Sequence, residues 1–133
     1  MRKYISILIM SLSFFSLFAQ GGKSFRTVGV DEFASYTAKP GVTVLDVRTP
    51  AEHLQGFIPG TDLNIDVLED SFASEAVAKL PKGAPVALYC RSGNRSKSAA
   101  RILSSKGYSV IELGSGFNGW VSSGRKVSKP KTK

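Results

Sequence analysis

Residues 85–106 read PVALYCRSGNRSKSAARILSSK and contain three features of one structural unit. The first part, Pro85–Tyr89, is short and apolar, which is typical of a buried strand. The last part, Ser96–Lys106, carries apolar residues at helical spacing and is followed by Gly107, a residue that favours the end of a helix. Between the two lies Cys90, at the start of a turn that contains glycine. The order strand, turn, helix is the repeating unit of an α/β fold.

The alternation of strands and helices continues on both sides of this unit. Further strands are expected at residues 27–30, 42–47, 63–65 and 108–113, and helices at residues 31–39, 49–55, 70–80 and 117–122. Asp31 is expected to cap the first helix, and Thr49 the second, with Pro50 at its first position. Strands that alternate with helices form parallel sheets covered on both faces. We therefore predict an α/β fold whose central parallel sheet has about five strands, flanked by helices on both faces.

The composition fits one ordinary globular domain. The chain has 133 residues, of which 42% are hydrophobic and 21% charged, so it can bury a single core without disulfides. The formal net charge is +8, and part of the excess lies in residues 125–133. No aromatic residues interleave with those lysines and no nucleic-acid motif accompanies them, so we interpret them as a solvated end and expect no nucleic-acid partner.

The N-terminus has the layout of a secretory signal peptide. Arg2 and Lys3 precede an apolar run over residues 4–18, and Ala19 offers a small residue for cleavage. The run is shorter than the roughly 20 residues of a membrane span. We expect a signal peptide at 1–19, a flexible stretch at 20–25, one domain at 26–127 and a basic tail at 128–133. The mature protein would be periplasmic or extracellular, with no stable membrane insertion; an uncleaved N-terminal anchor is the alternative.

Cys90 is the only cysteine and therefore forms no internal disulfide. In an exported protein such a thiol is buried and inert, paired to another chain, or reactive. Cys90 follows a strand and precedes a helix N-terminus, where free N–H groups favour negative charge. Arg91 and Arg95 add positive charge nearby, and such surroundings favour the thiolate. This pattern favours the reactive alternative over a core thiol.

The residues after the cysteine suit a loop that curls around one anion. Gly93 allows successive N–H groups to point inward. Asn94 tolerates the left-handed backbone angles that a tight loop often needs, and Ser96 is a candidate to cap the following helix. The loop from Cys90 to Ser96 thus suits a nucleophilic sulfur that receives and then stores another sulfur atom.

Four motifs in this order resemble those of the rhodanese homology family in its single-domain form. They are Leu45-Asp46-Val47-Arg48 with Glu52, Gly56-Phe57-Ile58-Pro59-Gly60 followed by Asn64-Ile65, Cys90-Arg91-Ser92-Gly93-Asn94-Arg95-Ser96, and Gly116-Phe117-Asn118-Gly119-Trp120. The resemblance covers about residues 25–127. There are departures, since Phe57 replaces the usual His, residues 61–63 are one residue longer than the common spacing, and Ser115 replaces a usual Gly.

The resemblance implies a sulfurtransferase with Cys90 as the catalytic residue. Its thiolate would take the outer sulfur of a small anionic donor such as thiosulfate, and a thiol or cyanide-type acceptor, including a thiol protein, would remove the sulfur from the persulfide. The substrate-binding residues would be Arg91, Ser92, Gly93, Asn94, Arg95 and Ser96. No cofactor is implied. No metal is expected either, because no ligand cluster accompanies His53, the lone histidine.

Asp46 and Arg48 are candidates for support of the pocket, because they end a strand on the side where Cys90 is expected. The interpretation that we prefer for Arg48 is an ion pair with Glu52 at i, i+4 spacing, which would hold the loop after the strand. Trp120 is interpreted as a packing aromatic.

Two other functions compete with sulfur transfer. Cysteine phosphatases and arsenate reductases use Cys, five residues and Arg; here Ser96 occupies that Arg position and Arg95 comes one residue too soon, so the loop fits a single sulfur better than a phosphate. A non-enzymatic persulfide carrier or binding module would keep Cys90 and use a docking surface in place of a small acceptor.

Overall fold

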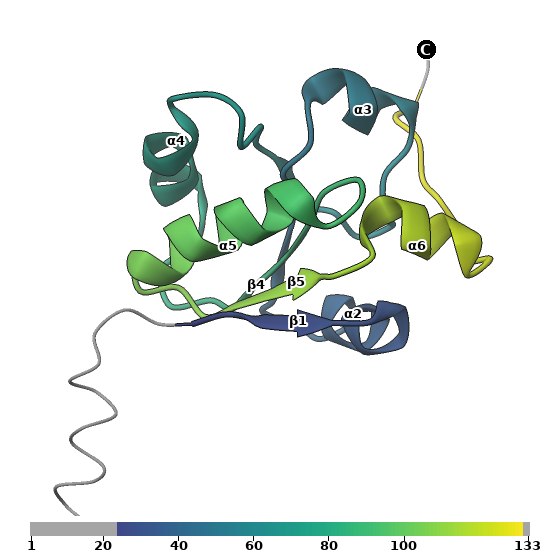
Figure 1. Ribbon diagram of the computed structural model, residues 1–133, viewed down its shortest axis with the longest axis horizontal. Coiled ribbons are helices and arrows are strands. Elements are labelled where there is room, and N and C mark those ends of the chain that lie inside the picture. The colour runs from purple at the N-terminus through teal and green to yellow at the C-terminus, as the bar shows by residue number, and fades with distance from the viewer. Residues whose placement is uncertain (1–23, 132–133) are drawn as a thin grey trace, which may run out of the picture.

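A computed structural model describes residues 24–131, which form a five-stranded parallel sheet with helices on both faces (Figure 1). The strands are β1 (Arg26–Val28), β2 (Thr43–Asp46), β3 (Leu63–Asn64), β4 (Val86–Tyr89) and β5 (Val110–Leu113), in the order β1-β5-β4-β2-β3. The helices are α2 (Val30–Thr37), α3 (Pro50–Gln55), α4 (Phe72–Lys79), α5 (Asn94–Ser105) and α6 (Gly116–Ser122). All strand pairs are parallel, which confirms the predicted fold class.

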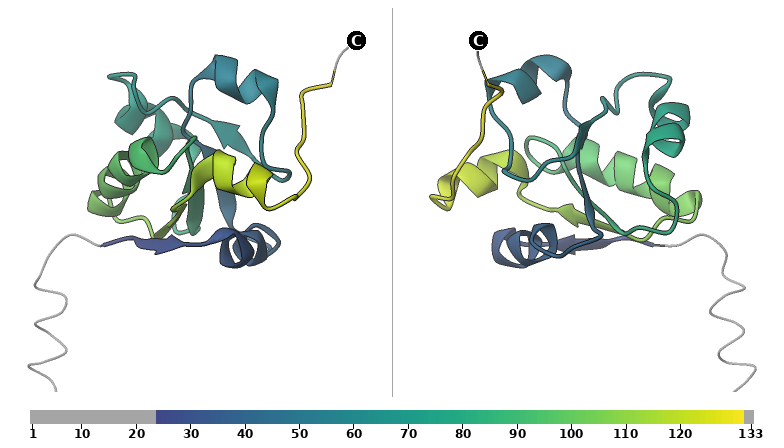
Figure 2. Two further views of the ribbon diagram at one scale, coloured as in Figure 1. Left: turned by 45° about the vertical axis from the view of Figure 1, so that its right-hand side comes forward. Right: turned by 180° about the vertical axis from the view of Figure 1, so that it is seen from behind.

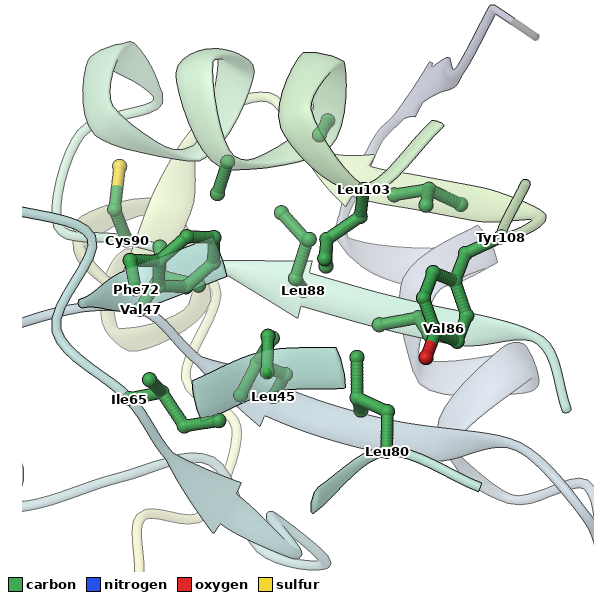
Figure 3. Close-up of a cluster of buried hydrophobic side chains, with 14 residues drawn as sticks. Leu45, Val47, Ile65, Phe72, Leu80, Val86, Leu88, Cys90, Leu103 and Tyr108 are labelled. Atoms are coloured by element: carbon green, nitrogen blue, oxygen red, sulfur yellow. The ribbon is translucent and has the colours of Figure 1, made fainter. Parts of the chain in front are cut away.

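Two apolar cores lie on opposite faces of the sheet, because successive strand residues point to opposite sides. In β4, Val86 and Leu88 face one core and Ala87 and Tyr89 face the other. The first core packs against α4 and α5 and also contains Leu45, Val47, Phe72, Cys90, Leu103 and Val110 (Figure 3). The second packs against α2 and α6 and contains Val28, Phe33, Val44, Ile58, Leu113 and Trp120. Figure 2 shows α5 and α2 on opposite sides of the strands.

The helix starts follow local capping chemistry, with one difference from expectation. Thr49 caps α3 in a reciprocal arrangement with Glu52, and Pro50 is the first helical residue, as predicted. Asp31 does not cap α2, however. The helix begins at Val30 with Gly29 in the cap position, and Asp31 lies in the first turn, where the helix dipole favours its charge.

The C-terminal segment returns to the domain. The indole of Trp120, which is 5% exposed, donates a 2.7 Å hydrogen bond to the Lys126 carbonyl, so this residue packs as expected. Ser128, the first residue of the expected tail, then pairs with Phe57 in an antiparallel bridge. The expected signal peptide lies outside the described residues. Within residues 24–131, no helix has the length and apolar character needed to cross a membrane.

Candidate active site

Cys90 lies at the carboxyl end of β4, between the apolar core and a backbone turn. The residue is only 1% exposed, and its carbon atoms belong to the core under α5. Its Sγ accepts a hydrogen bond of 3.1 Å from the Gly93 N–H. Figure 3 shows the sulfur pointing away from Leu88 and Val47, toward the start of α5. The thiol is therefore buried at the edge of the apolar core, and its sulfur accepts one backbone amide of the loop, that of Gly93.

Gly93 provides the turn that brings this amide to the sulfur. Its φ of +103° lies in the left-handed region, and a Cβ at this position would stand 2.1 Å from the Gly114 carbonyl oxygen. Asn94, which tolerates left-handed angles, does not adopt them here. Gly93 alone reverses the chain, so Asn94 is free to begin α5, and no described residue other than glycine has a positive φ.

The backbone at the beginning of α6 binds the backbone of the cysteine loop. The Phe117 N–H donates to the Cys90 carbonyl at 2.8 Å, and the Asn118 N–H donates to the Arg91 carbonyl at 3.0 Å. This contact needs a glycine at position 116, because a Cβ there would lie 2.3 Å from the Arg91 carbonyl oxygen. The glycine-containing motif at residues 116–120 thus has a physical role in this structure: it supports the cysteine loop.

Arg95 forms a two-pronged ion pair with Glu52, at 2.8 and 2.9 Å. The predicted Arg48–Glu52 pair is therefore wrong, since Glu52 turns toward α5. The hydrogen bond from Arg95 lowers the pKa of Glu52 to about 2, and the same bond raises the pKa of Arg95, with a smaller electrostatic contribution from Cys90. Arg95 thus lies within electrostatic reach of the sulfur, but Glu52 balances its charge.

Glu52→Gln is expected to lower the free energy of unfolding by about 1–2 kcal/mol at neutral pH, because it leaves the half-buried Arg95 without its carboxylate. The pKa of Glu52 is lowered on folding, so the stabilisation is complete above the ordinary value of 4.5 and is lost as the pH falls through about 2. Urea unfolding of the wild type and of Glu52→Gln across this pH range should show that the difference in their free energies of unfolding becomes smaller in acid.

The matched control for this prediction is Glu75→Gln. Glu75 pairs with Lys79 at 2.8 Å on an exposed face of α4, where a single pair adds little stability. A loss with Glu75→Gln as large as that with Glu52→Gln, or a loss with Glu52→Gln that does not change between neutral pH and pH about 2, would contradict the assignment.

Asp46 and Arg48 form a buried pair beside the loop. Both nitrogens of the Arg48 fork bind the Asp46 carboxylate, at 2.9 and 2.7 Å, and Nη2 also donates to the Gly56 carbonyl at 2.7 Å. The two residues share a face because they are two apart at the end of β2. His53 bonds the same carboxylate through Nδ1 at 2.9 Å. The guanidinium of Arg48 lies 4.3 Å from the Phe117 ring centre and so connects β2 to α6.

A pocket of about 220 Å³ opens beside these groups. It is lined by Arg48, Glu52, Gln55, Arg91, Phe117 and Asn118. Arg91 is exposed and takes part in none of the ion pairs formed by the described residues, whereas Asp46 neutralises Arg48. The pocket therefore carries one unbalanced positive charge, next in sequence to Cys90.

The other predicted loop residues lie in different surroundings. Ser92 and Asn94 are exposed, while Ser96 is fully buried and donates to Glu112 at 2.5 Å. The expectation that Ser96 caps the helix is wrong, because α5 starts two residues earlier, at Asn94. Sequence reasoning missed Glu112, although a charged residue inside the apolar strand β5 is a signal that could have revealed it.

Within the described part of the chain, no group of three or more His, Cys, Asp or Glu side chains is placed to hold a metal ion. His53, which had been considered as a ligand, is instead bonded to Asp46 and stacked on Phe57 at 4.4 Å. The Phe at position 57, where the resembled motif has His, thus packs against the His53 ring.

Comparison with known proteins gives consistent matches. Residues 29–123 match the family model described as "Rhodanese-like domain". A sulfurtransferase of Allochromatium vinosum is 35% identical, over 68% of this chain and 81% of the relative. Thiosulfate sulfurtransferase GlpE of Tolumonas auensis is 29% identical, over 72% of this chain and 88% of the relative. A rhodanese-related protein from Thermoplasma volcanium superposes with a TM-score of 0.64 at 29% identity, over 78% of this chain and 98% of that one.

Proposed function

This chain belongs to the rhodanese-like domain family and is a sulfurtransferase of that family, and on that basis we propose that Cys90 carries the transferred sulfur as a persulfide. The observation that carries the proposal is the hydrogen bond of 3.1 Å from the Gly93 N–H to the Cys90 sulfur, inside a glycine turn at a helix start. The amide and the helix N-terminus both favour a negative charge at this sulfur.

The reaction has two steps, each an exchange at sulfur. In the first, the Cys90 thiolate attacks the outer sulfur of a donor such as thiosulfate; the new S–S bond forms, the donor's own sulfur–sulfur bond breaks, and sulfite leaves with the electron pair. In the second, cyanide or a thiolate attacks the terminal sulfur, and Cys90 leaves as a thiolate. Thiosulfate as donor is supported by the name of the Tolumonas auensis relative. A covalent intermediate of this kind gives ping-pong kinetics.

The charge in the adjacent pocket supports a small anionic donor. Among residues 24–131, no carboxylate pairs with Arg91, while Asp46 balances Arg48 and Glu52 balances Arg95. In our proposal Arg91 attracts the donor and stabilises the departing sulfite. Arg95, which was also expected to bind the donor, pairs with Glu52 and so joins α3 to the first turn of α5.

The geometry disfavours a phosphatase. The position where cysteine phosphatases have their arginine is occupied by Ser96, which is buried and bonded to Glu112. No guanidinium is therefore available there to hold the oxygens of a phosphate.

We further propose that the protein is exported, on the support of the apolar run at residues 4–18 and the small residue at 19. One experiment tests both proposals: the intact mass of the full-length gene product isolated from its native cells, before and after treatment with thiosulfate. We expect a chain that begins near Gln20 and gains about 32 Da, the mass of one sulfur atom. Peptide mapping should place the added mass on Cys90.

The control is the same sample treated with sulfite, which carries no transferable sulfur. An unchanged mass with thiosulfate and other sulfane sulfur donors, together with turnover of an aryl phosphate, would overturn sulfur transfer by Cys90. A chain that keeps residues 1–19 would overturn cleavage of the signal.

A further inference from the structure

Two carboxylates among the described residues are fully buried: Asp46, which pairs with Arg48 beside the pocket, and Glu112, which has no part in the proposed reaction. Glu112 lies in β5 with an exposure of 0%, between apolar neighbours on the strand. It shares the α5 side of the sheet with Val110, and its strand partners are Leu88 and Thr27.

Three donors satisfy this carboxylate, and two of them come from the first turn of α5. Ser96 Oγ donates to Oε1 at 2.5 Å, Thr27 Oγ1 donates to Oε2 at 2.6 Å, and Lys97 Nζ lies 3.0 Å from Oε2. Burial of a carboxylate away from water costs free energy unless the group is paired with a cation and hydrogen-bonded. Glu112 therefore fixes where the first turn of α5 sits on the sheet.

Lys97 extends the network to the cysteine loop. Its Nζ also donates to the Gly93 carbonyl at 3.1 Å, so one ammonium group bridges Glu112 and the residue whose N–H binds Cys90. In a trans peptide the C=O and the following N–H point in opposite directions. By holding the Gly93 carbonyl, Lys97 also sets the direction of the Asn94 N–H, one of the free amides at the start of α5.

We infer that Glu112, acting through Lys97, is a positioning residue for sulfur transfer: it holds Gly93 and the first amides of α5 in the arrangement that cradles the sulfur on Cys90. This inference rests on the proposed function. Well-packed apolar residues often stabilise a core as well as a buried ion pair does. Because the partners of Glu112 support the cysteine loop, its charge is better explained by positioning of that loop than by stabilisation of the core.

The test is steady-state kinetics of thiosulfate turnover by Lys97→Met, a change at a side chain that is 39% exposed. We expect kcat to fall about tenfold or more with the KM for thiosulfate within about twofold, because the cradle is disturbed and the donor pocket is not. Lys97→Arg should restore most of kcat, since a guanidinium can also bridge the carboxylate and the carbonyl. Arg91→Ala should show the opposite split, with KM raised about tenfold.

Val110→Ala separates positioning from stability. Val110 is buried on the same strand and face as Glu112 and contacts the core, so this change should lower the melting temperature at least as much as Lys97→Met while it leaves kcat within about twofold. Glu112→Gln, if it folds, should reproduce the kcat loss of Lys97→Met.

The outcomes distinguish this inference from the proposal that it rests on. A wild-type protein that accepts no sulfur overturns both. A wild-type protein that accepts sulfur, beside a Lys97→Met variant with unchanged kcat or one that Lys97→Arg fails to restore, overturns the positioning role alone.

Discussion

Cys90→Ser is expected to abolish sulfur transfer, with no measurable turnover of thiosulfate and no gain of about 32 Da in intact mass. An alcohol oxygen is a poor nucleophile at neutral pH and cannot form the S–S bond of a persulfide. The hydroxyl is close in size to the thiol and can accept the same Gly93 N–H, so the loop should keep its conformation. The measurements are a thiosulfate:cyanide assay and mass spectrometry of the treated protein.

The control for this prediction is the fold of the variant. Because Cys90 is 1% exposed among apolar side chains, Cys90→Ser buries a polar group and should cost about 1–3 kcal/mol, which urea unfolding will show. Cys90→Ala, which avoids that polar group, should be equally inactive. Turnover by either variant above about one hundredth of wild type would contradict the assignment of Cys90 as the sulfur carrier.

Gly93→Ala is expected to reduce turnover by about a hundredfold and to destabilise the domain. Two effects add at this position. An alanine with φ near +103° is strained, and its Cβ would stand 2.1 Å from the backbone oxygen of Gly114, so the loop has to move and the amide that binds the Cys90 sulfur moves with it. Kinetics with thiosulfate and a thermal unfolding curve measure the two losses.

Gly107→Ala is the matched control, because Gly107 has a similar left-handed φ but lies at the other end of α5, away from the cysteine loop. Gly107 has φ +97°, but a Cβ there would meet nothing within 4 Å. It should therefore show only the cost of the left-handed conformation, about 1–2 kcal/mol, with turnover close to wild type. Equal turnover in Gly93→Ala and Gly107→Ala would show that the close approach of Gly93 to Gly114 has no part in the reaction.

The sheet and the place of Cys90 could be predicted from the sequence because both depend on local patterns. The apolar run at Pro85–Tyr89 and the helical spacing after Asn94 are patterns within short stretches of sequence. The parallel topology follows from the alternation of strands and helices along the chain. The boundaries of α5 were less accurate. Ser96 resembles a helix cap in sequence, but Gly93 reverses the chain so sharply that the helix begins at once.

The ion pairs could not be predicted. Their partners are either distant in sequence, or follow the two-residue spacing of a strand and not the four-residue spacing of a helix. Spacing on a helix pointed from Arg48 to Glu52, yet Arg48 lies just after a strand, where residues two apart share a side and Asp46 is the nearer carboxylate. Glu52 and Arg95 are 43 residues apart and meet only because α3 and α5 both start at the carboxyl edge of the sheet.

The support of the cysteine loop by α6 uses only main-chain atoms on both sides. The amides of Phe117 and Asn118 hold the carbonyls of Cys90 and Arg91, so the loop keeps its shape whatever side chains it carries at positions 91 and 92. In the proposed function, Arg91 attracts the donor while the backbone of the loop holds the stored sulfur, so the two properties depend on different atoms. We therefore expect substitutions at these two positions to change which donors the enzyme accepts while the loop conformation stays the same.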